Sequence, residues 1–377
     1  MAIAAAAAAS AGATAAASSP LLLLLLAAAI ALLFLYLFAK ADCDLALYLR
    51  GPAPPDAFRG QVVWVTGASQ GLGEEICRRL AARGARLVLS SRSRAKLEAV
   101  AKTLPLAPNT AKPVVLPLDL ATASQADFER AAQQADAAFP GGVDVLLHVA
   151  GGSQHSLAHE TSDSVTDAVF ALNASGPIKL TRAALPYLLG HKGGEGAGAA
   201  AASASRPRRV VAVCSAAAIC PSPGEAVYSG AKAALLGYLR SLASETADTR
   251  LRVTIACPGP IATGTDDKPR VIFGAEGVQG AAAPGAPKRS KKGRLDPERC
   301  ADLVLASAYH GLDESWLSRH PVLLLMHVMQ WLPFAGRALM RVVGPKRAHG
   351  MHTGESSGYD VKALLFGKRG GGAKKAA

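Results

Sequence analysis

The chain has 377 residues, half of them hydrophobic, which is enough to bury one large core. Its formal net charge is +13, but the basic residues are scattered and no aromatic residues interleave with them, so the charge does not indicate a nucleic-acid-binding protein. Solvated loops or contacts with an anionic membrane surface account for the basic residues. The six cysteines show no CxxC pair and no histidine spacing typical of a metal site, and we expect reduced, mostly buried thiols. A single domain with extensions is therefore predicted.

The N-terminal region contains an apolar segment that is long enough to cross a bilayer. Residues 1–20 are rich in Ala and Ser and predict a disordered tail. Residues 21–38 are uncharged and almost wholly apolar, and as a helix they span roughly 27 Å, close to the thickness of the hydrocarbon layer. A transmembrane anchor is predicted, with a cleaved signal peptide as the alternative. The nearest basic residues, Lys40, Arg50 and Arg59, follow this run, so the positive-inside rule favours a cytosolic catalytic domain.

A glycine-rich turn follows the first predicted strand. The apolar run 62–65 leads into Thr66-Gly-Ala-Ser-Gln-Gly-Leu-Gly73, and residues 74–82 are predicted to be helical. Glycine lets the backbone approach a phosphate closely, and the N–H groups at a helix N-terminus attract anions. The turn therefore predicts a site for a dinucleotide pyrophosphate, with a plain tight turn as the alternative. The candidate residues are Gly67, Ser69, Gln70, Gly71, Leu72 and Gly73.

The second predicted strand, 86–90, completes a βαβ unit and indicates which cofactor binds. No Asp or Glu follows this strand in the place where a carboxylate would hold the ribose 2′-hydroxyl of NAD. Ser91 and Arg92 stand there instead, and Arg92 suits a 2′-phosphate. NADP(H) is the predicted cofactor, and a solvated basic loop is the alternative reading of these residues.

The remaining elements alternate between strand and helix. This order is typical of an α/β, Rossmann-like, doubly wound parallel sheet, which we place in residues 58–315. Two segments without a pattern to bury, 191–206 and 274–292, are expected to be loops, the second either a substrate lid or a linker. The predicted strands are 113–118, 143–149, 210–214 and 251–257, and the predicted helices are 124–138, 161–189 and 226–246.

Four polar residues in the second half of the chain could carry acid–base chemistry. On a helix, Tyr228 and Lys232 lie one turn apart on one face. An ammonium group near a phenol favours the phenolate and brings its pKa toward the range useful for proton transfer. Ser215, at the end of the fifth strand, could hydrogen-bond a substrate carbonyl, and Asn173 could complete a proton path. Taken singly, such residues are more often a surface pair, a helix cap or a turn residue.

Five ordered motifs in residues 60–265 together resemble the short-chain dehydrogenase/reductase family. They are TGASQGLG at 66–73, Asn173 in LNASG, Ser215, YSGAK at 228–232 and PGPIAT at 258–263. The resemblance implies that Asn173, Ser215, Tyr228 and Lys232 form a catalytic tetrad, in which Tyr228 transfers the proton and Lys232 also holds the nicotinamide ribose. It further implies that Asp119 contacts the adenine and that Thr263 lies near the nicotinamide amide. The cofactor site predicted from it also includes Leu120, Ala150, Gly151, Pro258, Gly259 and Ile261.

One motif departs from the family pattern. Where the family usually has Asn-Asn-Ala-Gly after the fourth strand, this chain has His148, Val149, Ala150 and Gly151. The small residues are kept but both amides are lost, on the adenosine side of the predicted site. His148 is expected to hydrogen-bond locally and to have no catalytic role.

The two ends of the chain resemble a narrower, membrane-anchored group within that family. The matching segments are 41–45 after the anchor, the tail motifs between residues 299 and 333, and, within the domain, 62–69 and 116–120. This resemblance implies a single-pass protein of the endoplasmic reticulum membrane that reduces lipophilic carbonyls, such as steroids, retinoids or quinones, with NADPH in lipid metabolism. Relatives are often dimers or tetramers, so a homo-oligomer is a possible assembly.

The C-terminal extension, 316–377, is expected to lie near the membrane or the substrate. Its segment 321–343 is apolar, with Arg337 and Arg341 one helical turn apart. Either a helix at the membrane interface beside the substrate entrance or an ordinary buried helix fits this pattern. Two other functions remain open: a 3-ketosphinganine reductase-like enzyme of sphingolipid synthesis, and a non-catalytic, membrane-anchored scaffold that binds the cofactor.

Overall fold

The computed structural model describes residues 20–190, 207–263, 271–278 and 293–352. Contacts divide the chain into two units, Met1–Ala41 and Asp42–Ala377. The first contains helix α2, Pro20–Lys40. Its stretch Leu21–Lys40 has a mean hydropathy of 3.0 and contains no buried residue, so it is apolar and long enough to cross a membrane, a property that N-terminal signal sequences share.

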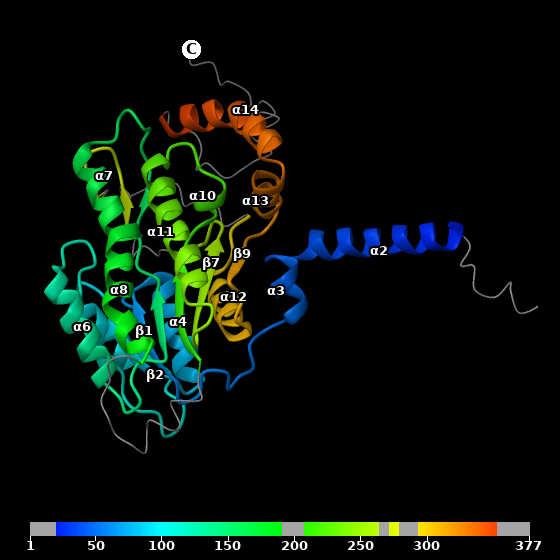
Figure 1. Cartoon of the computed structure of the whole chain (residues 1–377). Coiled ribbons are helices and arrows are strands. Elements are labelled where there is room, and N and C mark those ends of the chain that lie inside the picture. Colours follow the sequence, from blue (N-terminus) through cyan, green and yellow to red (C-terminus); the bar gives the residue numbers. More distant parts are fainter. Residues whose placement is uncertain (1–19, 191–206, 264–270, 279–292, 353–377) are drawn as a thin grey trace, which may run out of the picture. The chain divides into compact units, whose positions relative to one another are not determined.

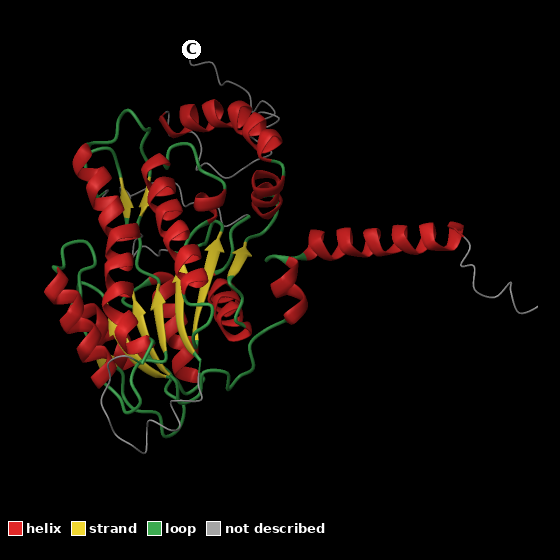
Figure 2. Ribbon diagram, in the orientation of Figure 1, coloured by secondary structure: helices red, strands yellow, loops and turns green. Residues whose placement is uncertain are grey.

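The second unit is built on a seven-stranded parallel sheet (Figure 2). Its strand order is β3-β2-β1-β4-β6-β7-β9, so the chain starts in the middle, moves to one edge and then returns to build the other half. The doubly wound α/β fold predicted from the sequence is confirmed. The strands are β1 Val62–Thr66, β2 Arg86–Ser90, β3 Val114–Val115, β4 Val145–His148, β6 Arg208–Val213, β7 Leu251–Pro258 and β9 Glu314–Leu317.

Helices cover both faces of this sheet, which explains why its central strands are apolar along their whole length (Figure 1). In β1, Val63 and Val65 pack into the core on one face, whereas Val62 and Trp64 pack into the core on the other. The first core includes α4 Gly71–Ala82, α5 Arg94–Thr103 and α12 Pro297–His310, and the second includes α6 Gln125–Ala137, α8 Gly176–Leu188 and α11 Ala226–Glu245.

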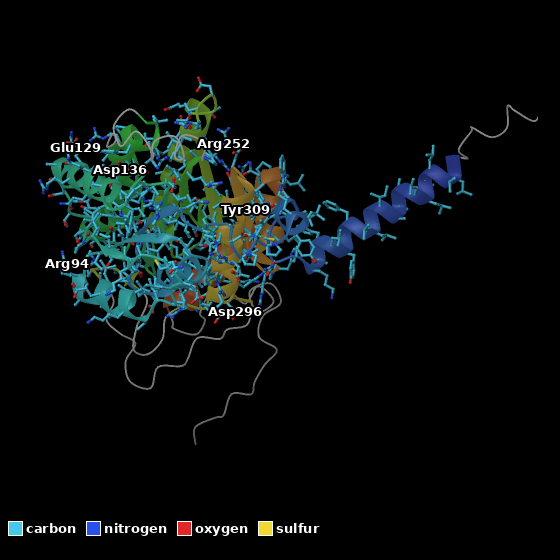
Figure 3. The ribbon with its side chains drawn as sticks, turned by 90° about the horizontal axis from the view of Figure 1, so that it is seen from below. Arg94, Glu129, Asp136, Arg252, Asp296 and Tyr309 are labelled. Carbon is cyan, nitrogen blue, oxygen red and sulfur yellow. The ribbon has the colours of Figure 1, made fainter. Side chains whose placement is uncertain are left out.

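The outer faces of the covering helices are polar. Arg94 on α5 and Glu129 on α6 point outward from the domain (Figure 3), and both are exposed. The covering helices are therefore amphipathic, with one side in the core and the other in solvent.

The six cysteines are all free and buried, as the sequence predicted.

Several short elements lie beyond the carboxyl ends of the strands, where α10, α13 and α14 are seen in Figure 1. Leu332 and Pro333 separate the last two helices, because proline cannot donate the backbone hydrogen bond that would continue α13. These elements are β5 Ser153–Gln154 paired with β8 Ile272–Phe273, α7 Asp163–Phe170, α10 Ala216–Ile219, α13 Val322–Trp331 and α14 Pro333–His352; α3 Leu45–Arg50 follows the N-terminal unit.

Two predicted elements differ from the structure, and one strand was not predicted. The helix predicted over 161–189 is interrupted by a π-helical turn, Ala171–Ser175, between α7 and α8. The strand predicted over 113–118 is reduced to Val114–Val115, flanked by Pro113 and Pro117, which lack the N–H group that a sheet needs. The strand β9 was not predicted. The loop 191–206 lies outside the described residues, as does most of the loop 274–292.

Candidate active site

A cavity of about 560 Å³ opens at the carboxyl ends of the strands. It is lined by the glycine-rich turn after β1, the residues that follow β2, β4, β6 and β7, and side chains of α11, α13 and α14. In open α/β sheets, ligands bind at this edge. All predicted site residues line this cavity except Asn173.

The glycine-rich turn has a shape that only glycine allows at two positions. Gly67 has a φ of +72°, and a Cβ there would lie 2.6 Å from the backbone nitrogen of Ala150. A Cβ on Gly73 would lie 2.1 Å from the carbonyl oxygen of Gly67. Helix α4 begins at Gly71, and the side chain of its N-cap residue, Gln70, makes no capping hydrogen bond. The backbone can thus approach a pyrophosphate closely at an N-terminus that the Gln70 side chain does not cap.

The residues after β2 fit a phosphorylated ribose. Ser91 has a buried hydroxyl with no hydrogen-bond partner among the described residues, so it is a polar atom that a ligand oxygen would satisfy. Arg92 and Lys96 are exposed and line the same part of the wall. Lys96, in the first turn of α5 and four residues after Arg92, was not predicted as a site residue. On the neighbouring segment, Asp119 accepts a hydrogen bond from the backbone N–H of Ala121 at 3.0 Å.

His148, the residue that departs from the family pattern, is buried and does not line the cavity. Its Nε2 lies 2.9 Å from the hydroxyl of Thr181, which itself donates to the carbonyl of Pro177. Because that hydroxyl proton is already engaged, Nε2 carries the ring proton and donates it to Thr181. Burial, with a smaller contribution from Lys232, lowers the pKa of His148 from 6.5 to about 3, so the ring is neutral. Its local hydrogen bond agrees with the expectation from the sequence.

This burial makes a prediction for the stability of the protein in acid. The unfolded chain takes up a proton on His148 near pH 6.5, whereas the folded chain does so only near pH 3. The stability that depends on the neutral ring is therefore present above pH 6.5 and lost as the pH falls toward about 3. The free energy of unfolding of the wild type decreases between neutral pH and about pH 5. In denaturant titrations, this decrease should be smaller in His148→Asn by about 2 kcal/mol. His159→Asn, at an exposed position, is the control, and an unchanged pH dependence in His148→Asn would contradict the assignment.

Tyr228 and Lys232 face the cavity from adjacent turns of α11. The ammonium nitrogen of Lys232 lies 5.9 Å from the centre of the Tyr228 ring and donates to the carbonyl of Val213 at 3.2 Å. Lys232 is buried, and that burial lowers the pKa of its ammonium group. A cation and a phenol are therefore held together in a desolvated wall.

Gln154 holds the start of α11 and was missed by the sequence analysis. It is fully buried, and its Oε1 accepts hydrogen bonds from the backbone N–H groups of Val227 and Tyr228 at 3.0 and 3.1 Å. These are N–H groups of the first helical turn, which have no partner within the helix. Gln154 thereby fixes the position of the Tyr228 backbone.

Asn173 lies in the π-helical turn, behind the cavity wall. Its amide exchanges two hydrogen bonds with the backbone of Gly152, at 3.2 and 3.1 Å, and donates a third to the carbonyl of Val169 at 2.9 Å. A Cβ on Gly151 would lie 2.9 Å from Asn173 Oδ1 and 3.4 Å from Lys232 Nζ. Asn173 is thus brought next to Lys232, with the backbone of Gly151 between them. Single π-helical turns of this kind are frequent at functional sites.

Ser215 follows β6 and caps α10, where its Oγ accepts from the backbone N–H of Ala217 at 3.1 Å. The hydroxyl proton is not used by this contact. Because Ser215 also lines the cavity, its proton can be directed to a ligand oxygen.

The rest of the cavity wall is mainly apolar, and part of it comes from segment 321–343, one of whose two predicted positions is beside the substrate entrance. Three charged residues interrupt the apolar surface: Glu225 from the start of α11, Arg347 from α14, and Arg294. A cavity of this character suits a lipophilic molecule. The apolar lining residues outside the predicted cofactor site include Leu172, Val271, Val278, Val322, Leu325, Met340 and Val343.

Comparison with known proteins identifies relatives over most of the chain. The family model for short chain dehydrogenase matches residues 61–270. Dehydrogenase/reductase SDR family member 7 of Homo sapiens is 31% identical over 84% of this chain and 86% of its own length, and the Mus musculus protein of that name is 32% identical over 75% and 78%.

Solved structures share the fold at lower identity. A short-chain dehydrogenase from Burkholderia cenocepacia in complex with NADP has a TM-score of 0.54 at 23% identity, covering 75% of this chain and 97% of its own. One from Streptomyces avermitilis has a TM-score of 0.57 at 23% identity, covering 75% and 96%. With the matched family model and the relatives above, these likenesses show that the chain belongs to the short-chain dehydrogenase/reductase family of enzymes.

Proposed function

We propose that this oxidoreductase uses NADP(H) to reduce lipophilic carbonyl compounds, such as steroids, retinoids or quinones, at a membrane. The observation that carries the proposal is that Tyr228, Lys232 and Ser215 line the same cavity as the glycine-rich turn, and that the remaining wall is mainly apolar. A cofactor, proton-transfer groups and a lipophilic substrate could therefore meet in one place.

The side chains on this wall can divide the chemistry of carbonyl reduction between them. When bound, the nicotinamide cofactor supplies hydride-transfer chemistry. The hydroxyl of Ser215 donates a hydrogen bond to the carbonyl oxygen, and Tyr228 donates the proton at that oxygen. Lys232 stabilises the phenolate that Tyr228 becomes, and Asn173 holds the adjoining backbone at Gly152 in place. The reverse oxidation uses the same groups.

The preference for NADP(H) rests on the residues after β2. Arg92 and Lys96 line the wall beside the buried hydroxyl of Ser91. A charge-assisted contact with a 2′-phosphate contributes roughly 1.5–3 kcal/mol, which corresponds to ten-fold or more in affinity. Arg92→Asp should therefore shift the ratio of kcat/KM for NADPH over NADH toward NADH by at least about ten-fold. Arg94→Asp is the matched control, because Arg94 is exposed and does not line the cavity; equal ratios in the two variants would show that another residue reads the phosphate.

Membrane attachment is part of the proposal and is supported by two separate surfaces. Helix α2 is apolar, and its residues 21–36 are exposed. In the catalytic unit, Trp331, Leu332 and Phe334 form an apolar corner between α13 and α14, with 73%, 61% and 81% of their surface exposed. Exposed aromatic residues with nearby arginines are typical of the membrane interface. We place the protein in the endoplasmic reticulum membrane with its catalytic domain in the cytosol, and retention in the membrane after alkaline extraction tests the anchor.

A substrate panel tests the proposed activity. Full-length protein in detergent would be incubated with NADPH and one carbonyl compound at a time, from steroid, retinal, quinone and 3-ketosphinganine classes, and the alcohol product identified. Reduction of the first three classes supports the proposal, whereas exclusive reduction of 3-ketosphinganine would assign the enzyme to sphingolipid synthesis. NADPH binding without any product would favour the scaffold.

A further inference from the structure

A buried ion pair interrupts the apolar part of the cavity wall. Arg347 and Glu225 expose only 7% and 2% of their surface, and Arg347 Nη2 lies 3.5 Å from Glu225 Oε2. Both residues line the cavity, together with Met340 and Val343 of α14. The pair thus brings charged groups from distant parts of the chain to a place where the neighbouring wall is apolar.

Glu225 is held firmly in this position. Its Oε1 accepts a hydrogen bond from the hydroxyl of Ser153 at 3.3 Å, and Nε2 of His155 lies 3.5 Å from the same oxygen. Glu225 is the N-cap residue of α11, so it precedes Tyr228 along the chain by less than one helical turn. The ion pair therefore has a fixed position relative to the proposed proton donor.

Stability alone is a weak reason for such a pair. Removing two charges from water costs several kcal/mol, and apolar residues of similar volume often give an equally stable or more stable protein. Because Met340 and Val343 already line this wall, an apolar pair would fit its chemistry. A guanidinium presents a planar fork of donors that suits oxygen atoms, and a carboxylate accepts hydrogen bonds from hydroxyl groups.

We propose that Arg347 and Glu225 recognise a second oxygen on the substrate, a hydroxyl or a ketone other than the carbonyl that is reduced. The two opposite charges sum to zero, so the pair favours a neutral oxygen over a carboxylate, whose charge Glu225 would repel. Cys220, which also lines the cavity, adds no charge, because burial raises the pKa of its thiol to about 11. The preferred substrates are then lipophilic compounds that carry a second oxygen. This inference rests on the proposed reductase function.

The test compares two steroids that differ in the second oxygen. Androstanedione carries a ketone at each end and androstanone carries a single one. For the full-length enzyme in detergent, Arg347→Met should lower kcat/KM for androstanedione by about ten-fold, mainly through KM, and change the value for androstanone by less than about two-fold. Lys346→Met, at an exposed position on the same helix, is the matched control and should leave both values unchanged.

A second variant distinguishes a loss of substrate recognition from misfolding. Arg347→Met leaves the Glu225 carboxylate buried without its cation, which is destabilising. The double variant Arg347→Met, Glu225→Gln removes both charges and should show the same loss of discrimination between the two steroids, with a melting temperature close to that of the wild type. Equal loss on both steroids would indicate a purely structural pair and overturn the inference, as would unchanged discrimination. If the wild type reduced neither steroid nor any other carbonyl of the panel, the reductase proposal would fail first and this inference with it.

Discussion

Tyr228→Phe should lower kcat for carbonyl reduction by about a thousand-fold and leave NADPH affinity within about two-fold of the wild-type value. The phenylalanine ring fills the same space on α11, but it has no hydroxyl to donate the proton. The backbone of residue 228 remains held by Gln154, so the wall of the cavity keeps its shape. Steady-state rates with NADPH, together with cofactor binding followed by NADPH fluorescence, measure the two quantities separately.

Tyr238→Phe provides the matched control for this prediction. Tyr238 lies on the same helix, is half-buried and does not line the cavity, so its hydroxyl should be dispensable for turnover. Wild-type rates in Tyr228→Phe would show that another group gives the proton. Loss of NADPH binding in that variant would show that the hydroxyl holds the cofactor instead of acting in the chemistry.

Gly73→Ala should weaken NADPH binding by at least about ten-fold and lower the melting temperature. The new Cβ would lie 2.1 Å from the carbonyl oxygen of Gly67. Because that oxygen belongs to the backbone, the turn or the start of α4 must move. Forcing an extra methyl group into a packed site costs roughly 1–3 kcal/mol, and here the displaced backbone is the proposed pyrophosphate site. Equilibrium titration with NADPH and thermal melting would measure the two effects.

Gly237→Ala separates this clash from the general effect of adding a methyl group to a helix. Gly237 lies within α11, and a Cβ there would meet no atom within 4 Å. Alanine has the higher helix propensity, so this control should melt at the same or a higher temperature and bind NADPH normally. Undiminished NADPH affinity in Gly73→Ala would mean that the cofactor does not rest on this turn.

The sheet could be predicted from the sequence because its strands and covering helices have strong local patterns. Runs such as 62–65 are buried on both faces and are therefore apolar throughout, and α11 agrees with its predicted range to within one residue at the C-terminus. Strand β9 was missed because its residues, Glu314–Leu317, include polar side chains at an edge of the sheet, and its pairing with β7 depends on tertiary contact. The π-helical turn at Ala171–Ser175 has no periodicity that distinguishes it from an α-helix.

The candidate site was predictable where it is made of short motifs and not where distant segments meet. The turn 66–73 and the pair Tyr228 and Lys232 are local in sequence, so their spacing alone indicates how they lie. Gln154 and Arg347 reach the site only because of the tertiary fold: Gln154 lies on a two-residue strand and Arg347 lies on the last described helix. No local signal marks either residue.

The central proposal is that this cavity supports reduction of a lipophilic carbonyl by NADPH, with Tyr228 donating the proton. The measurement is NADPH consumption by the detergent-solubilised full-length protein on the carbonyl panel, with Tyr228→Phe as the blank. We expect turnover by the wild type on at least one class and none above background in the variant. NADPH binding without turnover of any carbonyl, or equal turnover by the two proteins, would contradict the account.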